Sequence, residues 1–187
     1  MTKISASRQI ILVTGPARSG KSEWAETMAA DSSKQVIYVA TGEVDPADLE
    51  WQSRIDCHKN RRPTDWKTLE VPIDLEAVVR SALESECLLI DSIGTWTANL
   101  LEQEQAIWEQ TQQDLMKSLK VATADVILVA EETGWGVVPA YPAGRLFRDR
   151  LGTLVRQIGA IADTVYLVTG GHALNLSALG TPLPDKN

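Results

Sequence analysis

The chain has 187 residues and a formal net charge of −7, with 25 Asp and Glu against 18 Lys and Arg. This length suits one domain with a real core, so we expect a single kinase-sized domain over residues 1–187, with a tail that frays from residue 178 or so. Coating nucleic acid or an anionic membrane requires excess Lys and Arg, so we expect no nucleic-acid partner.

Cysteine content and hydropathy indicate in which cellular compartment the protein works. The two cysteines, Cys57 and Cys87, are too few for a disulfide framework, and the first residues show no charged segment followed by an apolar one. The longest apolar runs are far shorter than the roughly 20 residues that cross a bilayer. We therefore expect a cytoplasmic protein with no membrane insertion.

Short apolar runs rich in Val and Ile predict buried strands at residues 9–14, 35–40, 87–91, 125–130 and 164–169. Because these runs are apolar on both faces, they favour a mainly parallel sheet with helices on both faces. Helix-length stretches separate the runs. The alternation predicts a doubly wound α/β fold.

The first predicted strand leads directly into GPARSGKS at residues 15–22, which matches G-x-x-x-x-G-K-[ST]. A chance glycine-rich turn would not explain why strand, loop, Lys-Ser and helix occur in order, so we interpret the segment as a phosphate-binding loop of a P-loop NTPase. Lys21 is expected to reach the β and γ phosphates, and the Ser22 hydroxyl to bind Mg²⁺. The predicted nucleotide-binding residues of the loop are Gly15, Pro16, Ala17, Arg18, Ser19, Gly20, Lys21 and Ser22.

A second predicted helix begins near Asp45 and Pro46 and ends near His58, which is followed by basic residues. An unperturbed histidine titrates near pH ~6.5, so neutral imidazole is available as a phosphorus nucleophile. The neighbouring cations would hold a triphosphate. On these residues alone, a surface helix end with solvated charges explains the cluster at least as well.

Acidic residues end two later strands. Asp91 closes one strand and Glu131 and Glu132 close the next, so each could bind magnesium, although Glu131 is explained equally well as a solubilising strand end.

The Gly- and Pro-rich segment 133–144 is predicted as a loop at the carboxyl edge of the sheet, where ligands bind in such folds. A helix follows over residues 142–162. His172, after the last strand, is interpreted as structural or solvent-exposed.

Residues 54–72, RIDCHKNRRPTDWKTLEVP, resemble the R-I-x-x-H-x-x-x-R-P-x-x-W-x-T-x-E-x-P segment of the bifunctional adenosylcobinamide kinase and adenosylcobinamide-phosphate guanylyltransferase family. Segments 11–22 and 88–101 also resemble motifs of that family, as do EETGWGVVP at 131–139 and GRLFRDRLG at 144–152. These motifs occur in the family's order over nearly the whole chain. The resemblance implies a RecA-like P-loop fold.

The resemblance also implies a function. The enzyme would phosphorylate adenosylcobinamide and transfer GMP from GTP to adenosylcobinamide phosphate in cobalamin biosynthesis, with His58 carrying GMP covalently. It implies GTP and ATP as substrates, Mg²⁺ held by Ser22 and Asp91, and a homotrimer with sites between subunits. Further implied nucleotide contacts are Thr41, Gly42, Glu43, Arg62, Pro63, Thr64, Asp65, Trp66, Glu70 and Asp91.

The chain departs from the family pattern in places. Pro16 replaces a usual glycine and removes one backbone N–H, and Val155 and Arg156 replace a common Asn-Gln, which puts a substrate role for that helix turn in doubt. Two rival functions stay open on the residues: a small-molecule P-loop kinase in which His58 has no role, and an assembly ATPase of RecA type.

Overall fold

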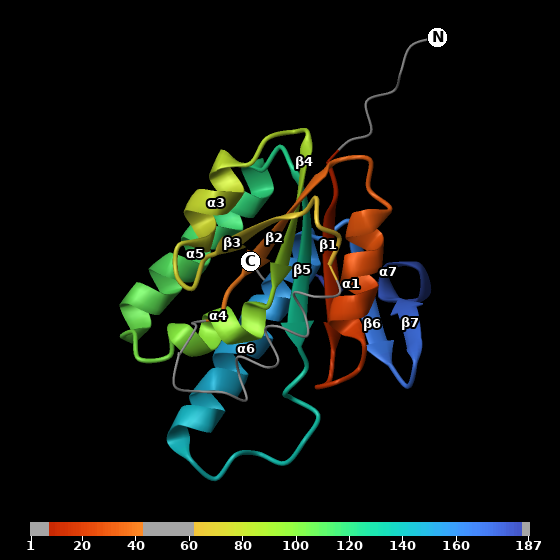
Figure 1. Cartoon of the computed structure of the whole chain (residues 1–187). Coiled ribbons are helices and arrows are strands. Elements are labelled where there is room, and N and C mark those ends of the chain that lie inside the picture. The colour runs from red at the N-terminus through yellow and green to blue at the C-terminus, as the bar shows by residue number, and fades with distance from the viewer. Residues whose placement is uncertain (1–7, 43–61, 185–187) are drawn as a thin grey trace.

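The computed structural model describes residues 8–42 and 62–184, which form a seven-stranded sheet in the order β3-β2-β4-β5-β1-β6-β7 (Figure 1). Every neighbouring pair is parallel except β6 and β7. The predicted α/β fold with a mainly parallel sheet is confirmed. The strands are β1 Ile10–Gly15, β2 Gln35–Ala40, β3 Lys67–Glu70, β4 Glu86–Asp91, β5 Asp125–Glu131, β6 Thr164–Thr169 and β7 His172–Asn175.

The apolar runs located five of these strands to within one residue at either end. The other two, β3 and β7, were not predicted. All four residues of β3 are exposed, so this edge strand has no apolar run to reveal it and forms by pairing with β2. His172 begins β7 and is exposed, as one of its two interpretations required.

Helices cover both faces of the sheet, as predicted (Figure 1). Helix α1 packs on one face, against alternate residues of β1 such as Ile11 and Val13. Leu12 and the other alternate residues of β1 face the opposite side, where α3 to α6 pack. The helices are α1 Lys21–Ala30, α3 Leu75–Ser81, α4 Ile93–Asn99, α5 Gln105–Val121, α6 Pro142–Ile161 and α7 Leu176–Leu179.

The long predicted helix is α6, which ends one residue earlier than expected. Its apolar stripe packs into the core, since Leu151, Leu154 and Ile158 are fully buried. The predicted helix that ends near His58 lies outside the described residues. Residues 181–184 of the tail have neither helix nor strand and are exposed. Within residues 8–42 and 62–184, no helix is both long enough and apolar enough to span a bilayer.

Strand order positions the functional site. Strand β5 lies between β1 and β4, and the carboxyl ends of all three strands reach the same edge of the sheet. Gly15 is paired with Glu131 across β1 and β5, and Asp91 is paired with Ala40 across β4 and β2. The phosphate-binding loop therefore lies at the same edge as the two acids.

Candidate nucleotide-binding site

The loop between β1 and α1 has the backbone of a phosphate cradle. Gly20 and Arg18 both have positive φ, at 91° and 58°. Gly15 cannot carry a side chain, because a Cβ there would collide with the carbonyl oxygen of Val168 on β6. Successive N–H groups can turn inward in this conformation, and α1 begins at Lys21 with the positive end of its dipole at the loop.

Two polar side chains of the loop, Lys21 and Ser19, have weak hydrogen bonds or none within the described residues. Lys21 is only 8% exposed, and its Nζ donates a long hydrogen bond of 3.3 Å to the Pro16 carbonyl. Ser19 Oγ is buried and makes no hydrogen bond within the described part of the chain. Buried polar groups normally find partners. Phosphate oxygens would supply them for both side chains.

Asp91 is held at the end of β4 by a neighbouring strand. The Tyr38 hydroxyl on β2 donates to Asp91 Oδ2 at 3.0 Å, and the Arg62 guanidinium lies 3.6 Å from the centroid of the Tyr38 ring. Burial, and then the Asp91 charge, raise the pKa of the Tyr38 phenol, so it stays protonated as a donor. Tyr38 therefore orients the carboxylate that the sequence proposed for magnesium.

Glu131 lies between the loop and Asp91. Its side chain is partly exposed, but the Oε2 atom is buried and makes no hydrogen bond within the described residues. Gly94 on α4 makes room for this carboxyl, since a Cβ there would collide with Oε2. Burial raises the pKa of Glu131, and the Asp91 charge raises it further, whereas Ser92 and the Lys21 charge lower it.

Glu131→Gln is expected to raise the melting temperature at neutral pH. A carboxyl whose pKa is raised by folding stabilises the fold fully below its usual value of 4.5, and this stability is lost as pH rises through the folded-state pKa. The amide carries no charge to bury. We expect a gain of about 2–4 °C at pH 7 in thermal melts, the shift that about 1 kcal/mol produces in a domain of this size, and a smaller gain at pH 4.

The matched control for that measurement is Glu84→Gln, which changes an exposed acid between α3 and β4 and should leave the melting curve unchanged at both pH values. A melting temperature of Glu131→Gln at or below wild type at pH 7 would show that the ionised carboxylate is well compensated. The burial argument would then be wrong.

Thr41 contributes through its backbone position. Its side chain is fully buried, and its hydroxyl donates to the Ser92 carbonyl and accepts from the Ser92 N–H, each at 2.8 Å. Asn99 Nδ2 on α4 donates to the Thr41 carbonyl at 2.7 Å. These bonds hold Thr41 and Gly42 at the carboxyl edge. Glu43 and His58 lie outside the described residues.

The structure brings only part of the 62–70 segment to this edge. Glu70 ends β3 and pairs with Ala40, so it lies at the carboxyl edge. The turn Pro63–Trp66 lies near the opposite edge, because Gln35 Nε2, at the start of β2, donates to the Asp65 carbonyl at 3.0 Å.

A six-residue strand spans about 20 Å, so within one chain Pro63, Thr64 and Asp65 do not join the phosphate-binding loop. Trp66 packs against the core under α1 instead. The sequence could not reveal this, because no apolar run marks β3 and the turn at 63–66 was therefore not recognised as preceding a strand.

Three neighbours of the site were missed. Tyr38 and Ser92 hold Asp91 and Thr41 in place, and Thr14 Oγ1 donates to Glu132 Oε1 at 3.0 Å. Tyr38 and Thr14 lie inside apolar strand runs, where a polar atom gives no local signal. In the sequence, Ser92 could have been identified as a neighbour of the site only because it directly follows Asp91.

Residues 11–176 match the sequence profile of the family described as cobinamide kinase / cobinamide phosphate guanyltransferase. The chain belongs to this family. The resemblance stated from the motifs is thus confirmed, and with it the class of enzyme and the link to cobalamin biosynthesis.

Relatives of this cobinamide kinase family member match along nearly their whole length. The bifunctional adenosylcobalamin biosynthesis protein CobP of Pseudomonas aeruginosa is 38% identical over 92% of this chain and 98% of its own. CobU of Escherichia coli K12, of the same description, is 36% identical over 89% of this chain and 99% of its own. A solved protein of Pyrococcus horikoshii OT3 shares the fold alone, with a TM-score of 0.54, 6% identity and coverage of 90% of this chain and 85% of that one.

Proposed function

We propose that this chain phosphorylates the aminopropanol hydroxyl of adenosylcobinamide and then transfers GMP from GTP to the resulting phosphate through a guanylyl-histidine at His58. One observation carries the proposal: a phosphate cradle with a buried lysine lies beside two acids at one sheet edge, in a chain of the cobinamide kinase family. A cradle of this kind positions a nucleotide triphosphate for attack.

The proposed transfer has two balanced steps. A ring nitrogen of His58 bonds to the α phosphorus of GTP as the bond to the bridging oxygen breaks, and pyrophosphate leaves. A phosphate oxygen of adenosylcobinamide phosphate then bonds to that phosphorus, and the P–N bond breaks to restore His58. Dividing the transfer in this way gives ping-pong kinetics.

The donors at this edge suit a magnesium ion that arrives with the nucleotide. Ser22 and Asp91 offer oxygen, which Mg²⁺ prefers, and the ion usually keeps waters and phosphate oxygens as its other ligands. Within the described residues there is no group of three or more His, Cys, Asp or Glu that could hold a metal without such help. Bound there, Mg²⁺ would neutralise charge on the departing phosphates.

The wider setting is proposed on the same grounds. We place the chain in the cytoplasm as a single domain over residues 1–187 and as a homotrimer with sites between subunits. The resemblance supports the trimer, and the acidic composition supports the absence of a nucleic-acid partner. The trimer would also allow Pro63, Thr64 and Asp65 to serve a neighbouring subunit's nucleotide.

The experiment that tests the function incubates the purified chain with adenosylcobinamide, ATP, GTP and Mg²⁺ and separates the products by mass. Adenosylcobinamide phosphate and adenosylcobinamide-GDP are both expected, and GTP labelled at the α phosphate should leave acid-labile label on the protein. Phosphorylation without protein label would favour the simple kinase. Nucleotide turnover at the same rate with and without adenosylcobinamide would favour the assembly ATPase.

A further inference from the structure

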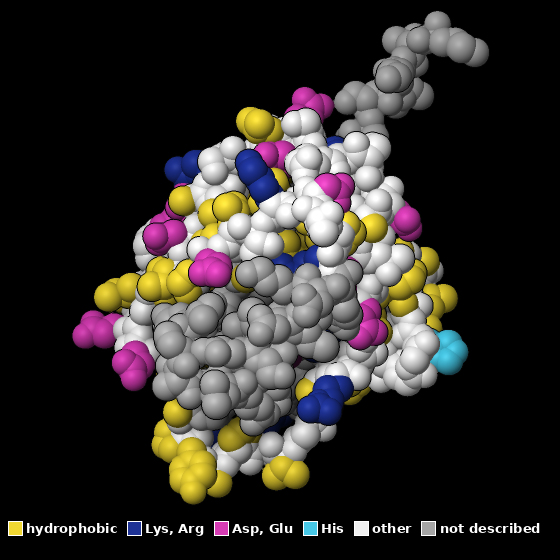
Figure 2. All heavy atoms as spheres, in the orientation of Figure 1, with side chains coloured by type: hydrophobic (Ala, Val, Ile, Leu, Met, Phe, Trp, Pro, Cys, Tyr) yellow, Lys and Arg dark blue, Asp and Glu magenta, His cyan; other side chains and the backbone are white. Residues whose placement is uncertain are grey.

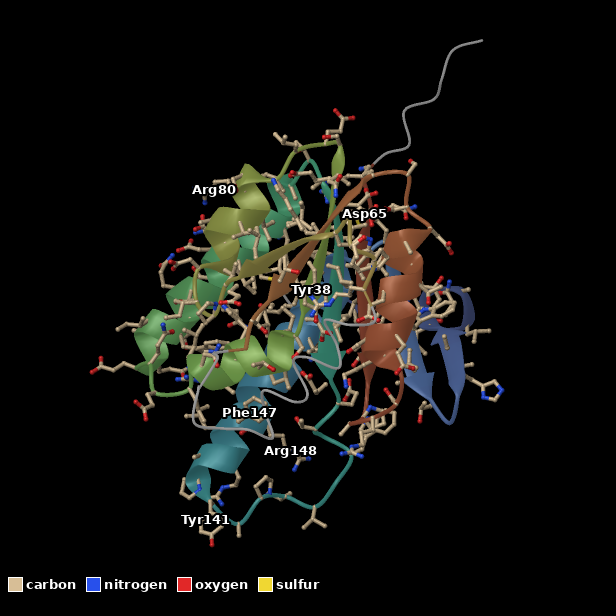
Figure 3. All side chains as sticks on the ribbon, in the orientation of Figure 1. Tyr38, Asp65, Arg80, Tyr141, Phe147 and Arg148 are labelled. Atoms are coloured by element: carbon tan, nitrogen blue, oxygen red, sulfur yellow. The ribbon has the colours of Figure 1, made fainter. Side chains whose placement is uncertain are left out.

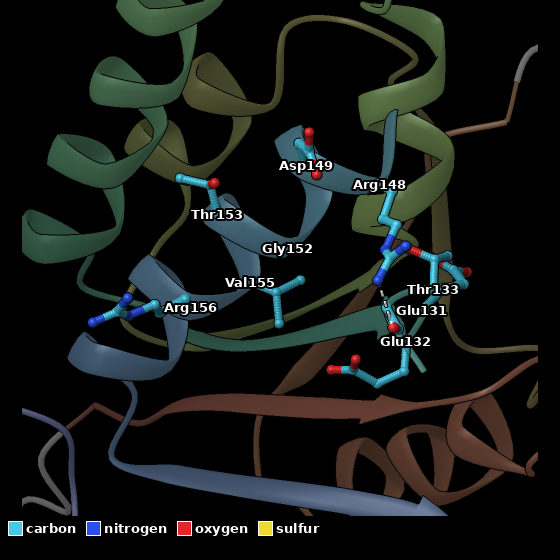
Figure 4. Close-up of a pocket in the computed structure, with 10 residues that line it drawn as sticks. Glu131, Glu132, Thr133, Arg148, Asp149, Gly152, Thr153, Val155 and Arg156 are labelled. Atoms are coloured by element: carbon cyan, nitrogen blue, oxygen red, sulfur yellow. Dashed lines mark hydrogen bonds between the residues drawn. The ribbon is translucent and has the colours of Figure 1, made fainter. Parts of the chain in front are cut away.

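A cavity of about 580 Å³ lies between α6 and the loop that follows β5 (Figure 4). The residues that matter for what it binds are Glu131, Glu132, Arg148, Asp149, Gly152 and Val155. Its volume is that of a small-molecule site. The phosphate-binding loop and Asp91 do not line it, and Glu131 is the described residue that it shares with the nucleotide-binding site.

Glu131 and Glu132, which line the cavity, nevertheless also contact the residues at the start of the phosphate-binding loop. The Glu132 N–H donates to the Gly15 carbonyl at 2.9 Å, and Thr14 Oγ1 donates to Glu132 Oε1 at 3.0 Å. Glu131 is paired with Gly15 across the sheet and interacts electrostatically with Lys21. A molecule in the cavity would thus lie next to the phosphates that Lys21 holds.

The cavity is lined by acidic side chains and by arginines. Three carboxylates offer hydrogen-bond acceptors, while Arg148 reaches from α6 to donate to the Gly134 carbonyl at 2.9 Å, which ties the loop to the helix (Figures 3 and 4). Val155 adds an apolar surface. A ligand with hydroxyl and amide groups, which both donate and accept, matches this lining better than a purely anionic one.

The loop also presents an apolar rim. It exposes four large apolar side chains, and Figures 2 and 3 show this end of the molecule, with Tyr141 at the far end of the loop. Clustered exposed apolar residues mark binding surfaces more often than single ones do. What we call the rim consists of Trp135, Val137, Val138 and Tyr141, which follow the cavity-lining residues 131–134 along the loop, do not line the cavity themselves, and are 64%, 94%, 61% and 80% exposed.

We propose that the cavity and its rim form the acceptor pocket, which binds the corrinoid substrate. The aminopropanol arm enters the cavity toward the phosphate-binding loop, and the macrocycle, too large for about 580 Å³, lies against the apolar rim. This inference rests on the proposed function, because it takes the acceptor to be a corrinoid.

Two motifs from the sequence gain a role in this way. Segments 131–139 and 144–152 resemble the family but provide no part of the phosphate cradle, and both line the acceptor pocket. Val155 and Arg156, where the chain departs from the family pattern, line it too. This departure therefore falls on residues of the cavity, whereas the departure at Pro16 falls on the phosphate-binding loop.

Gly152 allows the pocket to be filled without disturbing the fold. It lies on α6 at the pocket wall, and no heavy atom of residues 8–42 or 62–184 lies within 4 Å of a Cβ built there. Gly152→Leu should therefore weaken adenosylcobinamide binding by about tenfold or more, measured by equilibrium dialysis through the ligand's own visible absorbance. Arg148→Met should weaken it as well, through loss of a donor.

The control is Gln157→Leu, which adds the same side chain at an exposed position of α6 outside the pocket and should bind like wild type. Labelling of each variant by GTP shows that the fold and nucleotide site are intact, and its absence in wild type would count against the proposed function alone. Wild-type affinity in Gly152→Leu, or no binding of adenosylcobinamide to wild type, would overturn the acceptor pocket.

Discussion

Lys21→Ala should suppress both the kinase and the guanylyl-transfer reactions, each by about 10²-fold or more in kcat/KM, the loss typical when a preorganised charge is removed from an active site. Lys21 is the buried cation of the phosphate-binding loop, and its Nζ donates a long hydrogen bond of 3.3 Å to the Pro16 carbonyl. A triphosphate would replace that weak partner with strong ones. Initial rates of both reactions, measured separately, check this expectation.

A conservative variant sharpens the result. Lys21→Arg keeps the charge but places a planar fork where a compact ammonium fits, so it should recover only part of either rate. Lys67→Ala is the matched control, because it removes an exposed lysine from edge strand β3 and should leave both rates intact. Rates of Lys21→Ala near those of wild type would mean that the loop does not hold the reacting phosphates.

His58→Ala should abolish guanylyl transfer while much of the kinase rate persists. Only the transfer to adenosylcobinamide phosphate requires a nucleophilic side chain on the protein, since in the kinase step the substrate hydroxyl is itself the nucleophile. The variant should therefore accumulate adenosylcobinamide phosphate and form no adenosylcobinamide-GDP. Product analysis by mass, together with loss of the acid-labile label from GTP, measures both effects.

The chain contains two histidines, so one control variant is enough to test whether the label depends on His58. His172→Ala is the matched control, since that side chain is exposed on β7 and its Nδ1 lies 2.9 Å from the nearby Gly170 carbonyl. It should keep label and both products. If His58→Ala still made adenosylcobinamide-GDP near the wild-type rate, the covalent mechanism would be wrong.

Local patterns in the sequence were enough to predict most elements and the cradle. The loop at residues 15–22 depends on backbone conformations that glycine permits next to one strand and one helix, so its motif carries its structure. The stripe on α6 is likewise local, because apolar spacing along one helix decides which face packs inward. The family motifs then supplied the function.

Tertiary structure alone decided what lies around the cradle. Pairing of β5 with β1 places Glu131 beside Gly15. Pairing of β2 with β4 brings Tyr38 to Asp91, and pairing of β2 with β3 leaves Asp65 near the other edge. The acceptor pocket arises where the loop after β5 meets α6. Strand order and cavities depend on contacts between residues far apart in the chain, and neither propensity nor periodicity, which describe a residue's immediate neighbours, records such contacts.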